Sequence, residues 1–236
     1  MLTTSEEYGD VNSMKQIDKN TVKAENQLSK QKVVTFINPN GKGKRIMFVG
    51  NSITRHDVKP DIGWYNDWGM AATSLEKDYV HIMANKMLKK DAETAFCICH
   101  AAEWERNCYE GEKTFDLFKD AHDFNADIII MRIVENCPQN NYNDELFLKK
   151  YAELIAYLNN TGKAEVIITT GFWKHIADDA IRECAKKYNY PLIELSDLGE
   201  DDSMKAIGLF EHSGVANHPG DKGIQEIANR VLNRLS

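Results

Sequence analysis

A chain of 236 residues, 42% of them apolar, can bury one sizeable core, and α/β folds of this length commonly form a single domain. The net charge of −7 and the lack of a Lys/Arg block argue against a nucleic-acid partner, because a basic stripe supplies most of the affinity for phosphate groups. The longest apolar runs fall far below the roughly 20 residues that span a bilayer. The polar start of the sequence shows no signal peptide, so we expect a cytoplasmic protein without a membrane span, unless a signal has been removed.

The first part of the chain is polar and mostly without hydrophobic periodicity, and we interpret residues 1–44 as an N-terminal arm. The arm ends in the breaker cluster Asn38-Pro39-Asn40-Gly41-Lys42-Gly43-Lys44. This cluster lacks the G-x-x-x-x-G-K-[ST] spacing of a phosphate-binding loop and precedes a strand instead of following one, so we interpret it as a solvated turn. The folded domain is expected to span residues 45–236.

From residue 45 onward, short runs rich in Ile, Val and Phe alternate with longer segments whose apolar residues recur at spacings of three and four. Strands are expected at 45–49, 94–99, 127–133, 165–170 and 191–194. Helices are expected at 75–90, 114–121, 143–159, 176–188 and 221–235. This alternation predicts an α/β fold in which helices cover both faces of a five-stranded parallel sheet. Ligands bind such sheets at the carboxyl ends of the strands, so residues that directly follow strands are the candidates for chemistry.

A hydroxyl residue follows the first predicted strand, in the run Gly50-Asn51-Ser52-Ile53-Thr54. At a strand-to-helix junction Ser52 would lie at the mouth of the sheet, where the N–H groups of a helix start favour developing negative charge. A nucleophile fits this position. Ser and Asn are also good helix N-caps, so a purely capping role for Ser52 remains open.

A histidine precedes the last predicted helix, in the run Asn217-His218-Pro219-Gly220-Asp221-Lys222-Gly223. A His in such a loop can act as general base toward a Ser if the fold brings the two within hydrogen-bond reach. Activity would then fall on the acid side, with an apparent pKa near the ordinary value of about 6.5. Alternatively, His218 is a surface or capping residue, although Ser52 and His218 are more specific as a pair than either is alone.

The third predicted strand ends in the run Arg132-Ile133-Val134-Glu135-Asn136-Cys137-Pro138, which places an amide at the same edge of the sheet. Acyl transfer needs hydrogen-bond donors directed at the oxyanion, and an Asn side chain can supply one while backbone N–H groups supply others. Asn136 is therefore a candidate oxyanion donor. Alternatively, its amide satisfies the local backbone before Pro138.

Taken together and in this order, the block 50–54, Asn136 and the block His218-Pro219-x-Asp221-x-Gly223 resemble the SGNH, or GDSL-type, hydrolase superfamily. The resemblance covers residues 45–236. It implies a flavodoxin-like three-layer α/β/α sandwich and ester hydrolysis. It also implies Ser52 as the nucleophile, His218 as the base, and an oxyanion hole formed by Asn136 and backbone N–H groups, including that of Ser52.

The sequence departs from the family pattern at several positions. Asn51 stands where the first block usually has Asp, and Val134 stands where the third block has Gly. His100-Ala101-Ala102 occupies the place of the second-block Gly, whose backbone N–H joins the oxyanion hole. A backbone donor needs no particular side chain, so the resemblance leaves Ala102 or Ala101 to serve there.

The triad acid is also missing. The family places an Asp three residues before the His, and here that position is Val215. A Ser–His pair can still work if a carbonyl or another carboxylate holds the imidazole in the correct tautomer. The sequence leaves open the carbonyl of Val215 and the carboxylates of Glu105, Glu135 and Glu211 as this partner.

Tryptophans gather after the first two predicted strands. Trp64 and Trp68 lie in the long stretch 55–73, and Trp104 follows the second strand. Long loops with aromatic residues at this edge predict a substrate wall, and flat rings suit the faces of sugars. Alternatively, these side chains cover the core beneath the loops, since Trp is highly buried on average.

The cysteines give no sign of metal or redox chemistry. Their number, five, is odd, and no C-x-x-C pair occurs. We expect buried core thiols at Cys97, Cys99, Cys108, Cys137 and Cys184, because free Cys is among the most buried residue types. No metal and no cofactor is expected.

These patterns together predict a serine ester hydrolase of the SGNH type that acts on short acyl esters, with carbohydrate O-acetyl groups as the expected substrate class. Its partner would be a small-molecule or carbohydrate ester; the residues do not set the oligomeric state. One alternative is a lysophospholipase or thioesterase that acts on longer acyl chains. Another is a carbohydrate-binding protein on the same fold that has lost activity, which Asn51, Val134 and Val215 favour.

Overall fold

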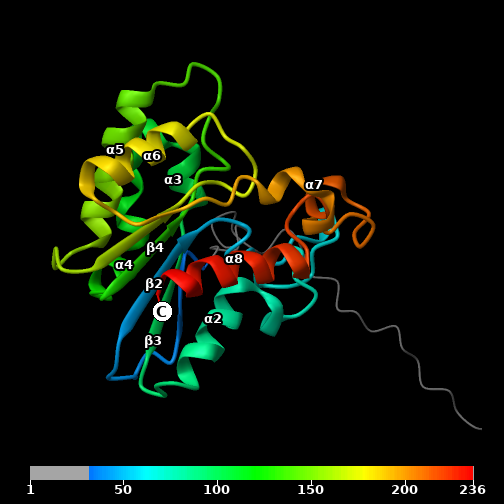
Figure 1. Cartoon of the computed structure of the whole chain (residues 1–236), viewed down its shortest axis with the longest axis horizontal. Coiled ribbons are helices and arrows are strands. Elements are labelled where there is room, and N and C mark those ends of the chain that lie inside the picture. The colour runs from blue at the N-terminus through cyan, green and yellow to red at the C-terminus, as the bar shows by residue number, and fades with distance from the viewer. Residues whose placement is uncertain (1–31, 236) are drawn as a thin grey trace, which may run out of the picture. The chain divides into compact units, whose positions relative to one another are not determined.

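The computed structural model describes residues 32–235, and its centre is a six-stranded sheet with the strand order β1-β3-β2-β4-β5-β6 (Figure 1). The strands are β1 (Val34–Ile37), β2 (Arg45–Gly50), β3 (Ala95–His100), β4 (Ile128–Arg132), β5 (Glu165–Thr169) and β6 (Leu192–Ile193). Strands β2 to β6 pair in parallel, and β1 pairs antiparallel with β3. The predicted five-stranded parallel sheet is confirmed, and it carries one additional strand on its edge.

Strand β1 lies inside residues 1–44, which the sequence predicts to be a polar arm. It is short and only partly buried, with Phe36 41% exposed, and no helix connects it to β2, so the β-α alternation does not reveal it. The predicted boundary at residue 45 therefore falls too late, because β1 is part of the sheet. The rest of the predicted arm, residues 1–31, lies outside the described residues.

Seven α-helices occur in the described part of the chain: α2 (Tyr79–Leu88), α3 (Ala102–Arg106), α4 (Lys119–Asp123), α5 (Asp144–Leu158), α6 (Asp178–Tyr188), α7 (Ser213–Ala216) and α8 (Asp221–Arg234). The 3₁₀ helices are η1 (Pro60–Ile62), η2 (Leu75–Lys77), η3 (Cys108–Phe118), η4 (Leu198–Glu200) and η5 (Asp202–Met204). Helices α5, α6 and α8 confirm three expected helices to within two residues. The first expected helix splits into η2 and α2, and the second is mostly the 3₁₀ helix η3, followed by the short α4.

Helices cover both faces of the sheet because successive strand residues point to opposite sides. In β2, Ile46 and Phe48 join the buried cluster formed with α2 and α8. Their neighbours Met47 and Val49 join the cluster formed with α5 and α6. Figure 1 shows α2 and α8 together on one face and α3 to α6 on the other. This arrangement is the expected three-layer sandwich.

The carboxyl ends of three central strands meet at one edge of the sheet. Gly50 at the end of β2 pairs with His100 of β3 on one side and with Arg132 of β4 on the other. The segments that follow these residues are the ones in which the sequence places Ser52, Ala102 and Asn136. The topology therefore gathers the predicted chemistry at a single edge.

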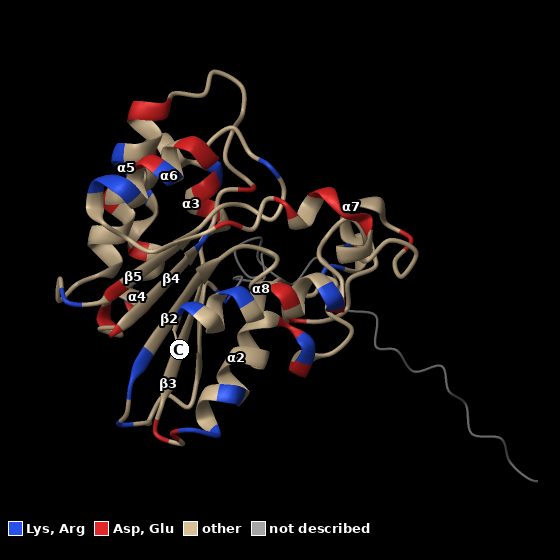
Figure 2. Cartoon of the chain, viewed as in Figure 1, with Lys and Arg blue, Asp and Glu red and all other residues tan. Residues whose placement is uncertain are grey.

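Charged residues of both signs are interspersed on the flanking helices. Figure 2 shows Lys or Arg and Asp or Glu alternating along α5, α6 and α8. Among the described residues, no helix combines the length and the apolar character needed to cross a membrane.

Candidate active site

Ser52 lies in a tight turn at the carboxyl end of β2. The carbonyl of Asn51 accepts the backbone N–H groups of Thr54 and Arg55 at 2.9 and 3.0 Å. A side chain at Gly50 would not fit, because its Cβ would lie 1.6 Å from Oγ1 of Thr54. The next α-helix is the distant α2, so Ser52 does not cap a helix. The expected strand-to-helix junction is in fact a strand followed by a turn and a long loop.

The hydroxyl of Ser52 and the ring of His218 meet although 166 residues separate them: Oγ lies 2.8 Å from Nε2. The other ring nitrogen, Nδ1, lies 2.7 Å from the carbonyl oxygen of Gly214. A carbonyl can only accept, so Nδ1 carries the proton and Nε2 presents its lone pair to the hydroxyl. This is the tautomer that a general base requires.

The short helix α7 makes the carbonyl of Gly214 available to the imidazole. In a regular α-helix this oxygen would accept the backbone N–H of His218, four residues further on. Instead, that N–H donates to the carbonyl of Val215 at 3.0 Å, which is the pattern of a 3₁₀ turn. The carbonyl of Gly214 is thereby left to the side chain of His218.

The partner of the imidazole differs from the residues that the sequence suggests. A backbone carbonyl takes the place of the missing acid, as one alternative predicts, but it belongs to Gly214 and not to Val215. The three carboxylates considered for this role bond to other groups or lie exposed: Glu105, Glu135 and Glu211. The prediction of these four partners is corrected accordingly.

The surroundings of His218 weaken its affinity for a proton. Burial lowers the pKa of His218 to about 4, although the hydrogen bond to Gly214 and the charge of Glu135 oppose the shift. We therefore expect a pKa for His218 below the value of about 6.5 that the sequence suggests. Trp173 contacts the ring edge-to-face, with centroids 5.4 Å apart. Sequence reasoning missed Trp173, although it follows β5 at the same sheet edge.

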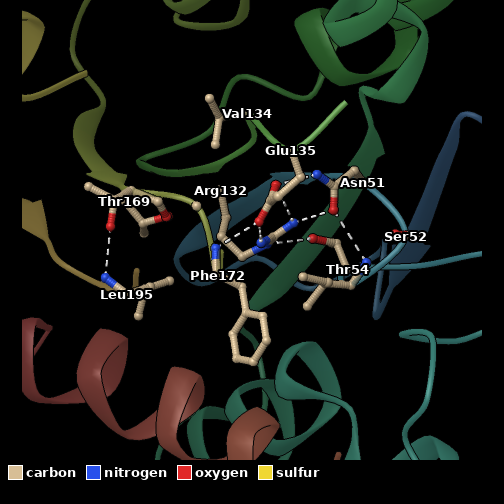
Figure 3. Close-up of polar contacts among 12 residues, drawn as sticks. Asn51, Ser52, Thr54, Arg132, Val134, Glu135, Thr169, Phe172 and Leu195 are labelled. Carbon is tan, nitrogen blue, oxygen red and sulfur yellow. Dashed lines mark hydrogen bonds and ion pairs between the residues drawn. The ribbon is translucent and has the colours of Figure 1, made fainter. Parts of the chain in front are cut away.

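A buried polar network lies behind Ser52 (Figure 3). The side chain of Asn51 is fully buried, and its Nδ2 donates to Glu105 at 2.9 Å and to Glu135 at 2.5 Å. Its Oδ1 accepts from the guanidinium of Arg132. Arg132, which is 1% exposed, also donates to Oε1 of Glu135 at 2.6 Å. The amide next to Ser52 is therefore held by charged groups on both its ends.

This network explains why Asn51 replaces the usual Asp. An Asp there would bring a third carboxylate against Glu105 and Glu135, while Arg132 supplies a single buried positive charge to the cluster. Burial raises the pKa of Glu135, but the attraction of Arg132 and the hydrogen bonds to Glu135 outweigh burial and lower it overall. Burial and the charge of Glu135 raise the pKa of Glu105 to about 7. An amide at position 51 supplies donors without adding negative charge.

Val134 stands where the pattern of SGNH hydrolases has Gly, and Gly171, just after β5, leaves room for its side chain. Val134 is fully buried, and a Cβ at Gly171 would lie 2.8 Å from its Cγ1. The side chain of Val134 thus fills the space that a residue other than Gly would need at position 171. Its backbone N–H donates to Oε1 of Glu105 at 2.6 Å.

The expected oxyanion donors lie on the segments that follow β2, β3 and β4. Nδ2 of Asn136 donates one hydrogen to Oε2 of Glu105 at 2.6 Å, and an amide nitrogen carries two. The N–H of Ala101 donates to the carbonyl of Gly50 at 2.6 Å, so it is already engaged. Ala102 is the first residue of α3, where a helix provides no acceptor for the N–H. Of the two alanines considered, Ala102 is therefore the one whose N–H is available as a donor.

The predicted tryptophan wall is wrong for two of its three members. Trp64 and Trp104 are both 0% exposed and belong to core clusters, so neither can line a substrate surface. Trp68 is partly buried and packs edge-to-face on Trp64, with centroids 6.2 Å apart. The exposed aromatic residue of this loop is Tyr65, which is 69% exposed. The alternative interpretation, Trp as cover for the core, holds for Trp64 and Trp104.

The five cysteines are free and buried, as expected. Within residues 32–235 no group of three or more His, Cys, Asp or Glu side chains is arranged to hold a metal ion.

Comparisons with known proteins extend this description. No family model and no curated protein matches the chain. The psychrotrophic esterase EstA from Pseudoalteromonas sp. matches with a TM-score of 0.55 and 9% identity, over 82% of this chain and 97% of that chain. The acetyl xylan esterase AlAXEase matches with a TM-score of 0.53 and 17% identity, over 81% of this chain and 100% of that chain.

A two-domain esterase active on acetylated mannans, CEX, matches with a TM-score of 0.53 and 15% identity, over 84% of this chain. The match covers 51% of that protein, so this chain spans about half of its length. These three esterases match most of this chain, as does a putative lipolytic protein of the G-D-S-L family from Desulfitobacterium hafniense, and the matches confirm the predicted fold. At such low identities the likeness is one of fold.

Val215→Asp tests whether His218 already has its partner. Val215 is fully buried with Trp64, Ala71 and Ala206, so a carboxylate there would lose its hydration. We therefore expect the free energy of unfolding to fall by about 2 kcal/mol or more. Because Gly214 already accepts from the ring, we expect kcat/KM on an ester to rise by less than about tenfold, a barrier change of about 1.4 kcal/mol. Urea unfolding and ester kinetics measure both, with Val215→Thr as the isosteric control. A hundredfold gain in kcat/KM would show that the imidazole lacks an effective partner.

The ring of His218 should remain neutral from pH 8 down to about pH 5, because burial lowers its pKa to about 4. The Cε1–H resonance of His218, assigned with a His218→Gln variant, reports this in an NMR titration. A titration midpoint at 6.5 or above would contradict the burial effect.

Proposed function

We propose that this protein is a serine esterase in which Ser52 is the nucleophile and His218 the general base. One observation carries the proposal: Ser52 Oγ lies 2.8 Å from Nε2 of His218, while Nδ1 is engaged by Gly214. A surface or capping histidine has no need for a fixed tautomer. A binding protein without activity has no need for a serine hydroxyl that faces the imidazole lone pair.

The reaction follows from this geometry. Oγ of Ser52 attacks the ester carbonyl carbon while its proton passes to Nε2 of His218. The resulting imidazolium gives the proton to the leaving alkoxide, and the alcohol departs. Water then attacks the acyl carbon of the acyl-serine while His218 accepts its proton. His218 returns this proton to Oγ of Ser52 as the carboxylic acid departs, which restores the hydroxyl. The dipole of the Gly214 carbonyl stabilises the imidazolium at Nδ1 in place of a carboxylate.

Three groups are proposed to stabilise the oxyanion that forms during each attack. The side-chain amide of Asn136 has one N–H beyond the one donated to Glu105. The backbone N–H groups of Ser52 and Ala102 belong to residues that lie two positions after the ends of β2 and β3. Donors placed in advance around developing charge are typically worth a factor of 10² to 10³ each in kcat.

Carbohydrate O-acetyl groups are the substrate class that we propose. Two of the similar structures support this proposal, an acetyl xylan esterase and an esterase active on acetylated mannans. A groove of roughly 630 Å³ also supports it, because its lining includes Tyr65, Asp61 and Glu211, an aromatic ring with carboxylates that can accept sugar hydroxyls. His212 lines the same groove and lies against Gly214, where a Cβ would be 2.9 Å from its Cε1. The groove therefore borders the loop that carries the general base.

Ser52→Ala should abolish ester turnover, with kcat lowered by about 10³-fold or more, because the attacking oxygen is lost. Thermal stability should stay the same, since Ser52 is not in the core and its backbone bond to Met70 is kept. Kinetics on the best ester and a thermal melt measure both effects. Ser203→Ala, which alters an exposed serine, is the matched control. A Ser52→Ala enzyme with more than a tenth of the wild-type kcat would refute the assignment of Ser52 as the nucleophile.

A series of nitrophenyl esters of increasing acyl length separates the short-chain proposal from the long-chain alternative. We expect kcat/KM to be highest for acetyl and to decline with length. A maximum at eight carbons or more would instead identify a lysophospholipase or thioesterase. Release of acetate from acetylated xylan or mannan, compared with the chemically deacetylated polymers, then tests the carbohydrate substrate.

A further inference from the structure

The carboxylate of Glu105 is a fully buried group of the described site whose task the proposed mechanism leaves unexplained. Glu105 lies on α3 and is 0% exposed. Its Oε1 accepts from Nδ2 of Asn51 at 2.9 Å and from the backbone N–H of Val134 at 2.6 Å. Its Oε2 accepts from Nδ2 of Asn136 at 2.6 Å. One carboxylate thus joins the nucleophile turn, the end of β4 and the proposed oxyanion donor.

The chemistry of these bonds selects one orientation of each amide. An ionised carboxylate only accepts, so the nitrogen end of an Asn amide turns toward it and the oxygen end turns away. Asn51 gives its second hydrogen to Glu135, whereas one hydrogen of Asn136 remains for another acceptor. If the amide of Asn136 were reversed, its oxygen would take that place and repel an oxyanion.

We propose that Glu105 is a positioning residue for the ester hydrolysis proposed above: it holds the amide of Asn136 with the nitrogen directed to the oxyanion and ties it through Asn51 to the turn of Ser52. The proposal rests on the proposed function. Glu105 is expected to contact neither the substrate nor the reacting atoms, and it acts through Asn136 and Asn51.

The charges around Glu105 make the hydrogen bonds that it accepts dependent on pH. Glu135 is neutralised by Arg132, but the direct bonds to Glu105 come from two amides and one backbone N–H. Protonation of Glu105 would turn one of its acceptor oxygens into a donor, although each oxygen already faces at least one donor: two at Oε1 and one at Oε2. Since burial and the charge of Glu135 raise its pKa to about 7, we expect this conflict to arise near neutral pH. The ionisable groups that face Glu105 or interact with its charge are Arg132, Glu135, Cys108, Cys137 and Tyr151.

Glu105→Gln tests the proposal, because it keeps the shape and replaces one acceptor by a donor. We expect kcat to fall about 100-fold, with KM changed by less than about threefold, as for the loss of an oxyanion donor. Glu103→Gln is the matched control, since Glu103 lies exposed on the same helix. Its kcat should stay within about twofold of wild type. A Glu105→Gln enzyme with wild-type kcat would overturn the proposal.

A double-mutant cycle separates positioning from general support of the fold. If Glu105 acts through Asn136, adding Glu105→Gln to an Asn136→Ala enzyme should lower kcat by less than about threefold further. A further loss of the full 100-fold would contradict the proposal. The acid limb of kcat against pH, expected near pH 7 in the wild type, should also disappear in Glu105→Gln. An acid limb near pH 7 that persists in this variant would equally contradict the proposal.

A readout without activity distinguishes this inference from the proposed function. If the wild type hydrolyses no ester, the proposed function fails, but the side-chain NH₂ resonances of Asn136 still report the bond to Glu105. We assign them by their absence in Asn136→Ala and follow them in the wild type from pH 5.5 to 8.5, which requires no folded Glu105 variant. One of the two proton resonances should shift with a midpoint near pH 7. Resonances that stay constant over this range would overturn the proposal.

Discussion

The hydrogen bond between Nδ1 of His218 and the carbonyl oxygen of Gly214 determines which lone pair faces Ser52. This bond depends on the way in which α7 ends. Because the backbone N–H of His218 bonds to Val215, three residues back, the carbonyl of Gly214 is free for the ring. The side chain of Val215 packs in a small core with Trp64, which fixes α7 against the long loop after β2. Val215 stands where the sequence pattern of SGNH hydrolases has an Asp. Its packing thus helps to place the carbonyl of Gly214, which bonds to the imidazole instead.

The buried carboxylates of this site bond to Asn51, next to Ser52, and neither bonds to His218. Glu105 and Glu135 both accept from Asn51, and Arg132 forms its ion pair with Glu135. His218 therefore has a dipole for its partner, and burial keeps its pKa low. A base of this kind stays neutral over a wide pH range, but it gains less from the imidazolium than a base with an Asp partner. We expect the groups around the oxyanion to carry a correspondingly larger share of the catalysis.

The sequence predicts those features that depend on local pattern and strand order. Ser52, His218 and Asn136 could be chosen because each follows a strand or precedes a helix at one edge of a parallel sheet, and the resemblance to a known family sets their order. The partner of His218 could not be predicted, because it depends on a 3₁₀ turn in a four-residue helix. Strand β1 was hidden for a different reason, since the alternation of strands and helices has no place for an antiparallel edge strand.

The burial of individual side chains is a property of the packed structure, and here sequence reasoning failed most clearly. Trp64 and Trp104 occur in segments where a substrate wall is reasonable, yet both rings enter the core. The burial of Glu105 is harder still to predict, because a Glu on a short helix normally faces solvent, as Glu103 does. Its task becomes visible only when Asn51, Val134 and Asn136 converge on it.

We propose that His218 activates Ser52 for attack on a carbonyl or a related electrophile. Incubation of the folded protein with a fluorophosphonate probe, followed by mass spectrometry of its peptides, tests this claim most directly, because the probe reports the activated hydroxyl without knowledge of the substrate. We expect one adduct per chain, located on Ser52, and labelling at least about 100-fold slower in His218→Gln. Labelling of another residue, or no labelling while the protein is folded, would contradict the account.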